Sequence, residues 1–209
     1  MTDFAALKKK VDELAHRNWD AAVIQTRIKN LVDHGIPKKK LEPKQMKANE
    51  EQILDRVQRR AEENNFYLRN CPQSTALALM EEFGLGNMEI IKALTPFPSI
   101  GGTGRICGGI SGSLIAFGLF FGSDRPPDFI KTNQAIRTSQ KFIASFEDAL
   151  GFINCSDIIR TFIIGRPLNP GESDAAMAEF AAEKGFEKCG LPPGTGARLA
   201  AGIIIDSIR

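Results

Sequence analysis

The chain has four cysteines, and each stands at or shortly before a predicted helix start: Cys71, Cys107, Cys155 and Cys189. Asn70 and Asn154 are N-cap residue types beside two of them, and Pro72 suits a first helical turn. A helix start exposes unpaired N–H groups and the positive end of the helix dipole, which together stabilise a thiolate. Cys189 is the least regular of the four, because its helix is predicted to begin a few residues later. The pattern predicts a fold in which helix starts hold thiolates.

Successive cysteines are 36, 48 and 34 positions apart, which leaves room for an outgoing helix, a returning helix and their turns. Apolar periodicity and capping residues predict the returning helices over residues 87–94, 126–150 and 173–184, and Gly185 is predicted to end the last of them. A final helix is predicted over residues 197–208. Alternate helices of an up-and-down bundle start at the same end, so the cysteines would gather there. The predicted fold class is therefore an all-α helical bundle.

The N-terminal third also has helical periodicity. An apolar stripe over residues 4–14 follows a Thr2 cap, and a second stripe over residues 19–32 ends at Gly35. These two segments predict a helical hairpin that extends the bundle. A third helix with a thin apolar stripe is predicted over residues 43–69.

The chain divides, on this pattern, into an N-terminal helical extension over residues 1–65 and a four-cysteine domain over residues 66–209. We expect the extension to pack on its own chain, in preference to a second copy or another protein. The thin stripes nevertheless offer a surface for a partner copy, so a homodimer or higher oligomer is predicted.

Composition indicates a globular protein with a core of ordinary size, because 43% of its 209 residues are hydrophobic and 25% are charged. The longest apolar stretch, residues 114–121, is too short to span a bilayer, and the first residues lack the apolar core of a secretory signal. We therefore expect a cytoplasmic protein without a membrane span. In that compartment, four cysteines are more typical of metal binding or redox chemistry than of structural disulfides.

Net charge argues against a nucleic-acid partner. The chain carries a net charge of only +2, and acidic residues are interleaved with the lysine runs at residues 8–10 and 38–40. A solvated helix surface is the favoured interpretation of these runs.

Glycines precede and follow Cys107, but they do not form a nucleotide-binding loop. The stretch lacks the third glycine of G-x-G-x-x-G, has no G-K-[ST] and follows no predicted strand. Close helix packing through Gly108, Gly112 and Gly118 is the favoured interpretation, and a bend around a cluster is the alternative. The only histidines, His16 and His34, lie in the predicted hairpin and are not credible bases, so no catalytic residue is assigned.

Several motifs of residues 66–208 are shared with a known family. Asn70-Cys71 opens a helix ending in Glu81-Glu82-Phe83-Gly84-Leu85, Cys107-Gly108-Gly109-Ile110-Ser111-Gly112 follows a glycine loop, and two later cysteines complete the set. The chain resembles the C_GCAxxG_C_C redox-active proteins, which carry four cysteines and a CGAxxG motif. It departs from them at Gly109, where the motif has alanine, and in its N-terminal extension. The resemblance implies a redox role, and the related domain of split-Soret cytochromes implies an iron-sulfur cluster.

Four thiolates suit a 2Fe-2S cluster, which is favoured, a 4Fe-4S cluster or a zinc ion. Zinc sites usually contain close Cys-x-x-Cys pairs, whereas single ligands from separate helices favour a cluster. The predicted ligands are the four cysteines. An anionic cluster would be stabilised by exposed backbone amides and one cation, so we assign cofactor binding to Gly102, Gly104, Arg105 and Gly108. Arg105 is equally well explained as a solvated loop residue.

The sequence thus predicts an iron-sulfur electron-transfer protein that meets a redox partner protein. One alternative is an enzyme or enzyme subunit whose cluster or metal activates a substrate. A second is a thiol-disulfide redox protein, although no Cys-x-x-Cys pair is present. A zinc-stabilised interaction module is the third.

Overall fold

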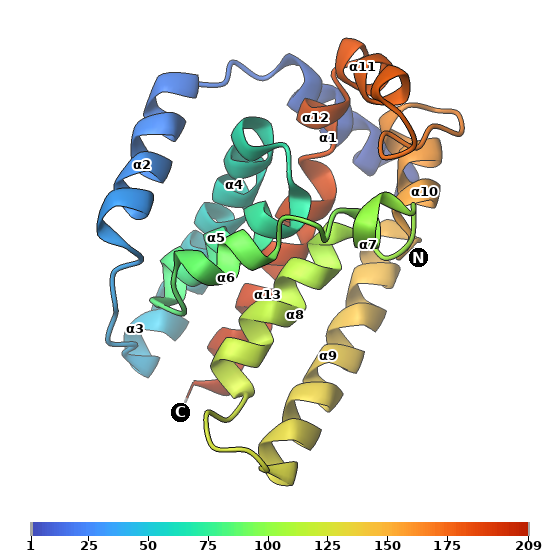
Figure 1. Cartoon of the computed structure of the whole chain (residues 1–209). Coiled ribbons are helices and arrows are strands. Elements are labelled where there is room, and N and C mark those ends of the chain that lie inside the picture. Colours follow the sequence, from blue (N-terminus) through green and yellow to red (C-terminus); the bar gives the residue numbers. More distant parts are fainter. Residues whose placement is uncertain (1, 209) are drawn as a thin grey trace.

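Helices form all the regular secondary structure of residues 2–208, which are the residues that the computed structural model describes (Figure 1). Over this range no β-strand occurs, and a single isolated bridge joins Ile106 to Asn154. The all-α fold class is confirmed. The elements are α1 (Phe4–His16), α2 (Ala21–His34), α3 (Pro43–Ala48), α4 (Glu50–Leu68), α5 (Cys71–Phe83), α6 (Met88–Ala93), α7 (Ser99–Gly102), α8 (Gly108–Phe121), α9 (Phe129–Leu150), α10 (Cys155–Ile158), the π-helix η1 (Ile159–Ile163), α11 (Asp174–Ala182), α12 (Gly185–Lys188) and α13 (Leu191–Ser207).

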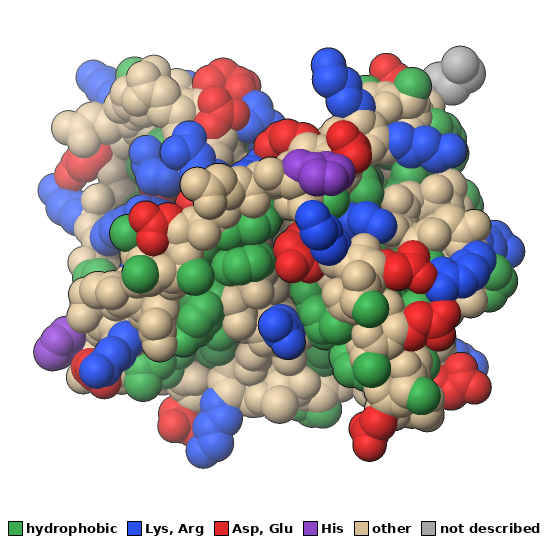
Figure 2. Space-filling model, turned by 90° about the horizontal axis from the view of Figure 1, so that it is seen from above, with side chains coloured by type: hydrophobic (Ala, Val, Ile, Leu, Met, Phe, Trp, Pro, Cys, Tyr) green, Lys and Arg blue, Asp and Glu red, His purple; other side chains and the backbone are tan. Residues whose placement is uncertain are grey.

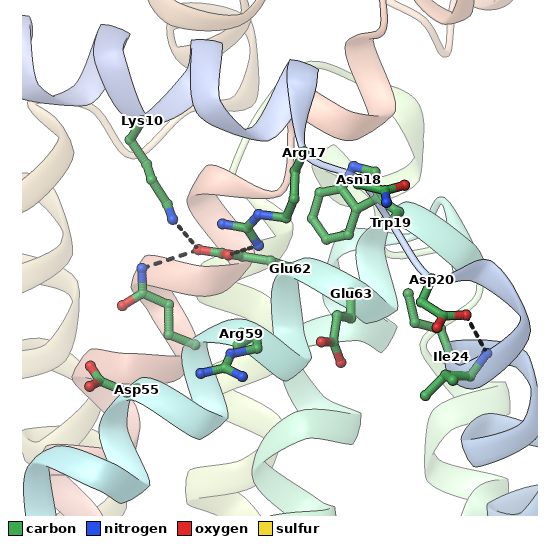
Figure 3. Close-up of a pocket in the computed structure, with 12 residues that line it drawn as sticks. Lys10, Arg17, Asn18, Trp19, Asp20, Ile24, Asp55, Arg59, Glu62 and Glu63 are labelled. Carbon is green, nitrogen blue, oxygen red and sulfur yellow. Dashed lines mark hydrogen bonds and ion pairs between the residues drawn. The ribbon is translucent and has the colours of Figure 1, made fainter.

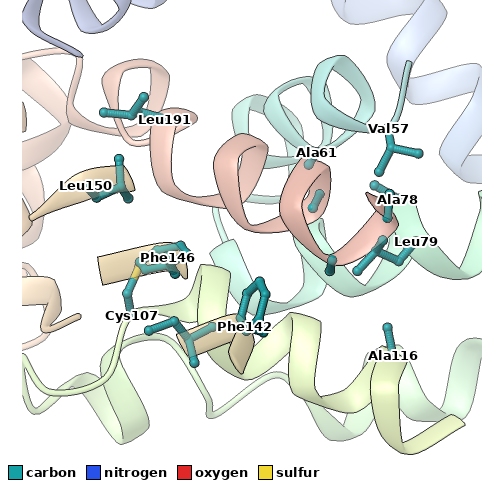
Figure 4. Packing of buried hydrophobic residues seen from close by; sticks show 14 of the residues in the cluster. Val57, Ala61, Ala78, Leu79, Cys107, Ala116, Phe142, Phe146, Leu150 and Leu191 are labelled. Atoms are coloured by element: carbon teal, nitrogen blue, oxygen red, sulfur yellow. The ribbon is translucent and has the colours of Figure 1, made fainter. Parts of the chain in front are cut away.

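Four helices form the centre of the bundle: α4 packs on α5 and α13, and α8 packs on the other side of the same two helices. The long helix α9 returns antiparallel to α8 and contacts both α8 and α13 (Figure 1). Fully buried side chains fill the space between these helices, including Leu79, Phe117, Phe142 and Phe146. Figure 4 shows Cys107 among them, so the thiol of this residue lies inside the apolar core.

The N-terminal helices pack on the bundle separately. Helix α1 contacts α12, η1 and α13, whereas α2 contacts α4, and Figure 1 shows the two helices far apart. The predicted hairpin is therefore wrong, while the expected packing within the chain is confirmed. Val11 and Leu14 of α1 belong to the same core as the helices that follow residue 65. One ion pair adds a long-range connection, because Arg17 pairs with Glu62 at 2.6 Å.

Local capping accounts for most helix ends. Asp3 caps α1 through its carboxylate, which accepts hydrogen bonds from two backbone N–H groups, so the predicted Thr2 cap is wrong. Gly35 ends α2 as predicted. The predicted third helix is interrupted at Asn49, whose φ of −110° and ψ of 18° separate α3 from α4.

The returning helices α6, α9 and α11 occupy the predicted segments, with Asn87, Asp128 and Ser173 as N-caps. Two boundaries differ from the prediction. Gly185 begins the short helix α12 instead of only stopping α11, and α13 begins at Leu191 because prolines are well tolerated in a first helical turn.

The surface seen in Figure 2 mixes Lys and Arg with Asp and Glu side chains, without a field of one sign. Within residues 2–208, none of the helices has the length and apolarity needed to cross a membrane.

Candidate functional site

Helices α5 and α8 meet at their N-terminal ends through glycine. Gly108, the first residue of α8, lies so close to Cys71 Sγ that a Cβ at this position would overlap the sulfur. One turn later, a Cβ at Gly112 would lie 2.5 Å from the Pro72 carbonyl oxygen and 2.8 Å from Thr75 Cβ. Because real Cβ atoms do not approach other atoms this closely, the contact between these helices requires glycine. It places Cys71 beside the start of α8.

Helices α8 and α13 approach each other in the same way. A Cβ at Gly109 would lie 2.6 Å from the Pro192 carbonyl oxygen, and a Cβ at Gly196 would lie 2.6 Å from the Gly109 carbonyl oxygen. Cys189 ends α12 and precedes α13 by two residues. The close contact therefore holds the Cys189 segment next to the start of α8.

A short antiparallel pairing joins the Cys107 segment to the Cys155 segment. The Cys107 N–H donates to the Ile153 carbonyl at 2.9 Å, and the Cys155 N–H donates to the Arg105 carbonyl at 2.8 Å. These bonds flank the isolated bridge between residues 106 and 154. The pairing places Cys155, at the start of α10, beside the segment of Cys107, at the start of α8. This pairing and the two glycine contacts together bring the cysteine-bearing segments to one end of the bundle.

Burial raises the pKa of all four cysteines, and repulsion from other cysteines adds to this for Cys71, Cys107 and Cys189. Burial, followed by the neighbouring Cys155 thiolate, raises the pKa of Cys71 to about 12, and burial raises the pKa of Cys155 to about 11. Burial also raises the pKa values of Cys107 and Cys189 well above the ordinary cysteine value, with the Cys71 and Cys155 thiolates as further causes. Cys107 is affected by Cys189 as well. Cys71, Cys107 and Cys189 are therefore close enough to other cysteines of this set to interact with them electrostatically.

Polar groups near these sulfurs partly offset the effect of burial. The backbone N–H groups of Gly108, Cys71 itself and Ser99 lower the pKa of Cys71, and the N–H of Gly109 lowers that of Cys107. The Ser99 hydroxyl lowers the pKa of Cys155. All of these interactions favour the thiolate and oppose the effect of burial. The site therefore combines one buried cysteine, Cys107, and three half-buried ones with polar groups that partly offset the effect of burial.

Across residues 2–208, no three Cys, His, Asp or Glu side chains form a group that could hold a metal ion as they stand. The donor set itself fits thiophilic groups, because four thiolates can ligate zinc or an iron-sulfur cluster. Metal ligation by the four cysteines stays a prediction.

The four residues predicted to bind a cofactor make different contacts in the structure. Gly108 lies directly against Cys71, as described above, and Gly104 accepts a hydrogen bond from the Ser156 N–H at 2.9 Å. The carbonyl of Gly102 accepts a hydrogen bond from Asn169 at 2.9 Å. The Arg105 side chain is exposed, while its backbone carbonyl bonds Cys155. Arg105 thus contributes to the cysteine end through its backbone.

Glycines were predicted to allow close helix packing, and two of the three do so. Gly108 and Gly112 make the contacts between α5 and α8, but a Cβ at Gly118 would have no atom within 4 Å. The prediction for Gly118 was therefore wrong. Ser111 and Ser113 donate to carbonyls of their own helix, at 3.4 and 2.8 Å, and so have structural hydrogen bonds.

Sequence reasoning missed Ser99, whose backbone N–H and hydroxyl lower the pKa of Cys71 and of Cys155 and so partly offset the effect of burial. Ser99 and the next three residues all have positive φ, a conformation that L-residues with large side chains rarely adopt. The only signal in the sequence was the pair of glycines that follows, Gly101-Gly102. Nothing local predicts that a serine and an isoleucine would share this conformation.

A pocket of about 530 Å³ lies away from the cysteines, between the α1–α2 connection and α4 (Figure 3). Its central carboxylate, Glu62, is only 2% exposed and pairs with Arg17 at 2.6 Å and Lys10 at 3.3 Å. Gln58 donates to the same carboxylate at 3.1 Å. These bonds satisfy the Glu62 carboxylate and attach α1 to α4.

Comparison with known proteins identifies the family of the cysteine half. The family described as "Putative redox-active protein (C_GCAxxG_C_C)" matches residues 69–203. No curated protein and no solved structure gave a significant match. The matched range contains all four cysteines, both glycine contacts and the Ser99 turn, and it spans more than half of the chain. The chain therefore belongs to the C_GCAxxG_C_C family of redox-active proteins.

Proposed function

We propose that this protein transfers electrons through an iron-sulfur cluster held by the thiolates of Cys71, Cys107, Cys155 and Cys189. The observation that carries the proposal is that the segments bearing the four cysteines, which belong to separate elements, meet at the start of α8. Single ligands set into the body of a fold suit a cluster better than the paired knuckles of a typical zinc module. The 2Fe-2S form is favoured and the 4Fe-4S form is the alternative.

The electrostatics of the site support ligation over thiol-disulfide chemistry. A thiol-disulfide enzyme needs an attacking thiolate of lowered pKa, whereas burial raises the pKa of every cysteine in this chain. A metal centre replaces the thiol protons and so removes the cost of ionising the sulfurs. Raised thiol pKa values in the metal-free protein therefore support a role of these cysteines as metal ligands.

The chain's own residues would exclude water and fix the ligand geometry. Cys107, 2% exposed, occupies the core beside Phe146, and the glycine contacts hold α5 and α13 against α8. The amides of Gly108 and Gly109 would donate to ligand sulfurs and so influence the reduction potential. The bound cluster would supply the site that accepts and releases one electron, and a redox partner protein would exchange that electron.

Purification without oxygen tests this proposal. We would measure iron, zinc and acid-labile sulfide per chain, together with the visible spectrum before and after reduction with dithionite. Wild-type protein should contain iron and sulfide in equal amounts and bleach on reduction. Cys107→Ser should lose most of the iron, whereas the matched control Ser113→Ala, buried on the same helix, should keep it.

Other results of that experiment would contradict the proposal. Stoichiometric zinc without sulfide would indicate the zinc-stabilised module. Metal-free protein with four titratable thiols after anaerobic purification would leave the thiol-disulfide alternative.

A further inference from the structure

Helix α9 is buried only in its second half. The helix lies at one edge of the bundle and packs on α8 and α13 (Figure 1). Its three buried side chains, those of Phe142, Phe146 and Leu150, all belong to the second half of the helix. Residues 129–141 contain no buried side chain. The first half of α9 therefore runs along the surface of the bundle.

This exposed part of α9 carries large apolar side chains. Ile130 and Phe129 are the two most exposed large apolar residues of the described range 2–208, at 83% and 76%. Ile136, two turns further along, is 50% exposed. Single exposed apolar residues are ordinary, whereas a group of them marks an interaction site. Because these three residues lie close together on one helix, they indicate a contact surface.

The charges within α9 run against the helix dipole. Residues 129–141 contain Lys131, Arg137 and Lys141 and no acidic residue, whereas the last turn contains Glu147 and Asp148 and no basic residue. The dipole favours the opposite order, with acidic residues in the first turn and basic residues in the last. No ion pair joins any of these five side chains to another residue of 2–208. A surface of opposite charge beside each part of the helix would therefore stabilise it.

Helical geometry gathers these residues on the outer face of α9. At about 100° per residue, side chains spaced by seven or eleven positions lie in nearly the same direction. Two neighbouring rows of exposed residues result: Ile130, Arg137, Lys141 and Asp148 in one, and Phe129, Ile136 and Glu147 in the other. Each row begins with an apolar residue and ends with an acidic one.

The acidic end of α9 also offers an exposed aromatic ring. Phe4 is 41% exposed, and a Cβ at Gly151 would lie 3.1 Å from its ring. The preceding segment is attached to the same end, because Thr2 Oγ1 donates to the Asp148 carbonyl at 2.8 Å. This end therefore combines negative charge with apolar surface, which is the complement of the apolar and basic residues 129–141.

We propose that two copies of this chain associate through the outer faces of α9, packed antiparallel about a two-fold axis. An antiparallel arrangement brings residues 129–141 of each copy against the acidic end of the other, where Phe4 is exposed. A parallel arrangement would place like charges side by side. Both complementary regions belong to one surface, as a two-fold interface requires. The proposal goes beyond electron transfer and does not depend on a metal centre.

The first experiment measures dimer formation by sedimentation velocity, with reduced full-length protein over a series of concentrations. It compares wild type with Ile130→Ser and with the control Val23→Ser, because Val23 of α2 is also 62% exposed. We expect wild type to form dimers. Ile130→Ser should raise the dissociation constant about tenfold through loss of an apolar anchor, and Val23→Ser should leave it unchanged. Monomeric wild type at every concentration, or a dimer that Ile130→Ser does not weaken, would overturn the proposal.

The second experiment tests the pairing of charges with two double variants. One combines Arg137→Glu with Lys141→Glu, and the other combines Glu147→Lys with Asp148→Lys. Each variant alone would place like charges opposite each other, so it should sediment as a monomer with an unchanged circular dichroism spectrum. An equimolar mixture restores opposite charges and should recover the dimer. A mixture that stays monomeric, or a variant that dimerises alone as well as wild type does, would contradict the antiparallel contact.

Two results would assign the face to another occupant. Monomeric wild type that sediments with phosphatidylglycerol vesicles, and loses this binding in Ile130→Ser, would indicate an anionic membrane surface. Monomeric wild type that binds neither itself nor these vesicles would leave the face to a different protein. Either result overturns the proposed dimer.

Discussion

The two ends of α8 contain glycine for different reasons. At the cysteine end, a Cβ at Gly108, Gly109 or Gly112 would overlap neighbouring atoms of α5 or α13. At the other end, Gly118 has open space where its Cβ would be. The comparison shows that glycine content alone does not mark a tight contact. The close approach is confined to the end of the helix where the cysteines meet.

This difference has an energetic meaning. Each glycine inside a helix costs about 0.5–1 kcal/mol relative to alanine, because the unfolded chain loses more freedom on folding. At the cysteine end, close packing of three helices offsets that cost, and at Gly118 nothing visible in the packing does so. Substitution by alanine should therefore have opposite signs at the two ends.

The largest effect is expected from Gly108→Ala. The new methyl group would meet Cys71 Sγ and would lie 2.8 Å from the Pro72 backbone nitrogen. Overpacking against backbone that cannot move freely should lower the free energy of unfolding by about 3 kcal/mol. Urea denaturation measures this loss, and iron analysis should show loss of loading in the same variant. Wild-type stability in Gly108→Ala would refute the required close approach.

Alkaline pH should destabilise the iron-free protein through the cysteine end. An unfolded cysteine ionises near pH 8.5, whereas burial raises the folded-state pKa of Cys155 to about 11. Below pH 8.5 both states are protonated and stability is fully present. Above it the unfolded state loses protons first, so the free energy of unfolding falls as pH rises toward 11.

For Cys155 alone this loss should reach about 3 kcal/mol near pH 11. Urea denaturation at a series of pH values measures it. Cys155→Ser is the control, because it removes the contribution of this thiol and should flatten the curve. A stability that does not change between pH 8 and pH 10.5 would mean that the thiols are not buried together.

Gly109→Ala restores the residue of the family motif and should still destabilise this chain. Its methyl group would lie 2.6 Å from the Pro192 carbonyl oxygen and 3.2 Å from the Phe146 ring. We expect a loss of about 2 kcal/mol, because α13 must shift to accept it. The thermal unfolding midpoint measures the change. A gain in stability would show that α8 and α13 stand further apart than in this structure.

Gly118→Ala should have the smallest effect and the opposite sign. Because the site is open and helical, the substitution should stabilise the protein by about 0.5–1 kcal/mol. Thermal unfolding under the same conditions measures the gain. A loss comparable to that of Gly109→Ala would remove the distinction between the two ends.

Local signals predicted the helices of the cysteine half well. Asn70 and Ser173 are both N-caps whose side chains accept backbone hydrogen bonds, and Gly84 ends α5 in the left-handed conformation. Capping depends on a few adjacent residues, so it can be read from sequence. The helix-start positions of Cys71, Cys107 and Cys155 were also predicted, whereas Cys189 ends α12.

The arrangement of the N-terminal helices could not be predicted in the same way. Arg17 and Arg27 look like solvated residues in the sequence, yet they pair at 2.6 Å with the carboxylates of Glu62 and Glu81. These partners lie 45 and 54 positions away, and no local pattern specifies them. The apolar stripe of α4 looks thin in the sequence because part of its buried face is polar. Glu62 and Asn64 are buried there, and each pairs with an arginine far away in the sequence.

A crystal structure of anaerobically purified protein, with anomalous scattering recorded at the iron and zinc absorption edges, tests the central claim most directly. We predict an iron signal at the cysteine end, bounded by the sulfurs of Cys71, Cys107, Cys155 and Cys189. A zinc signal at that position, or no signal with the four thiols free or joined in disulfides, would contradict the cluster.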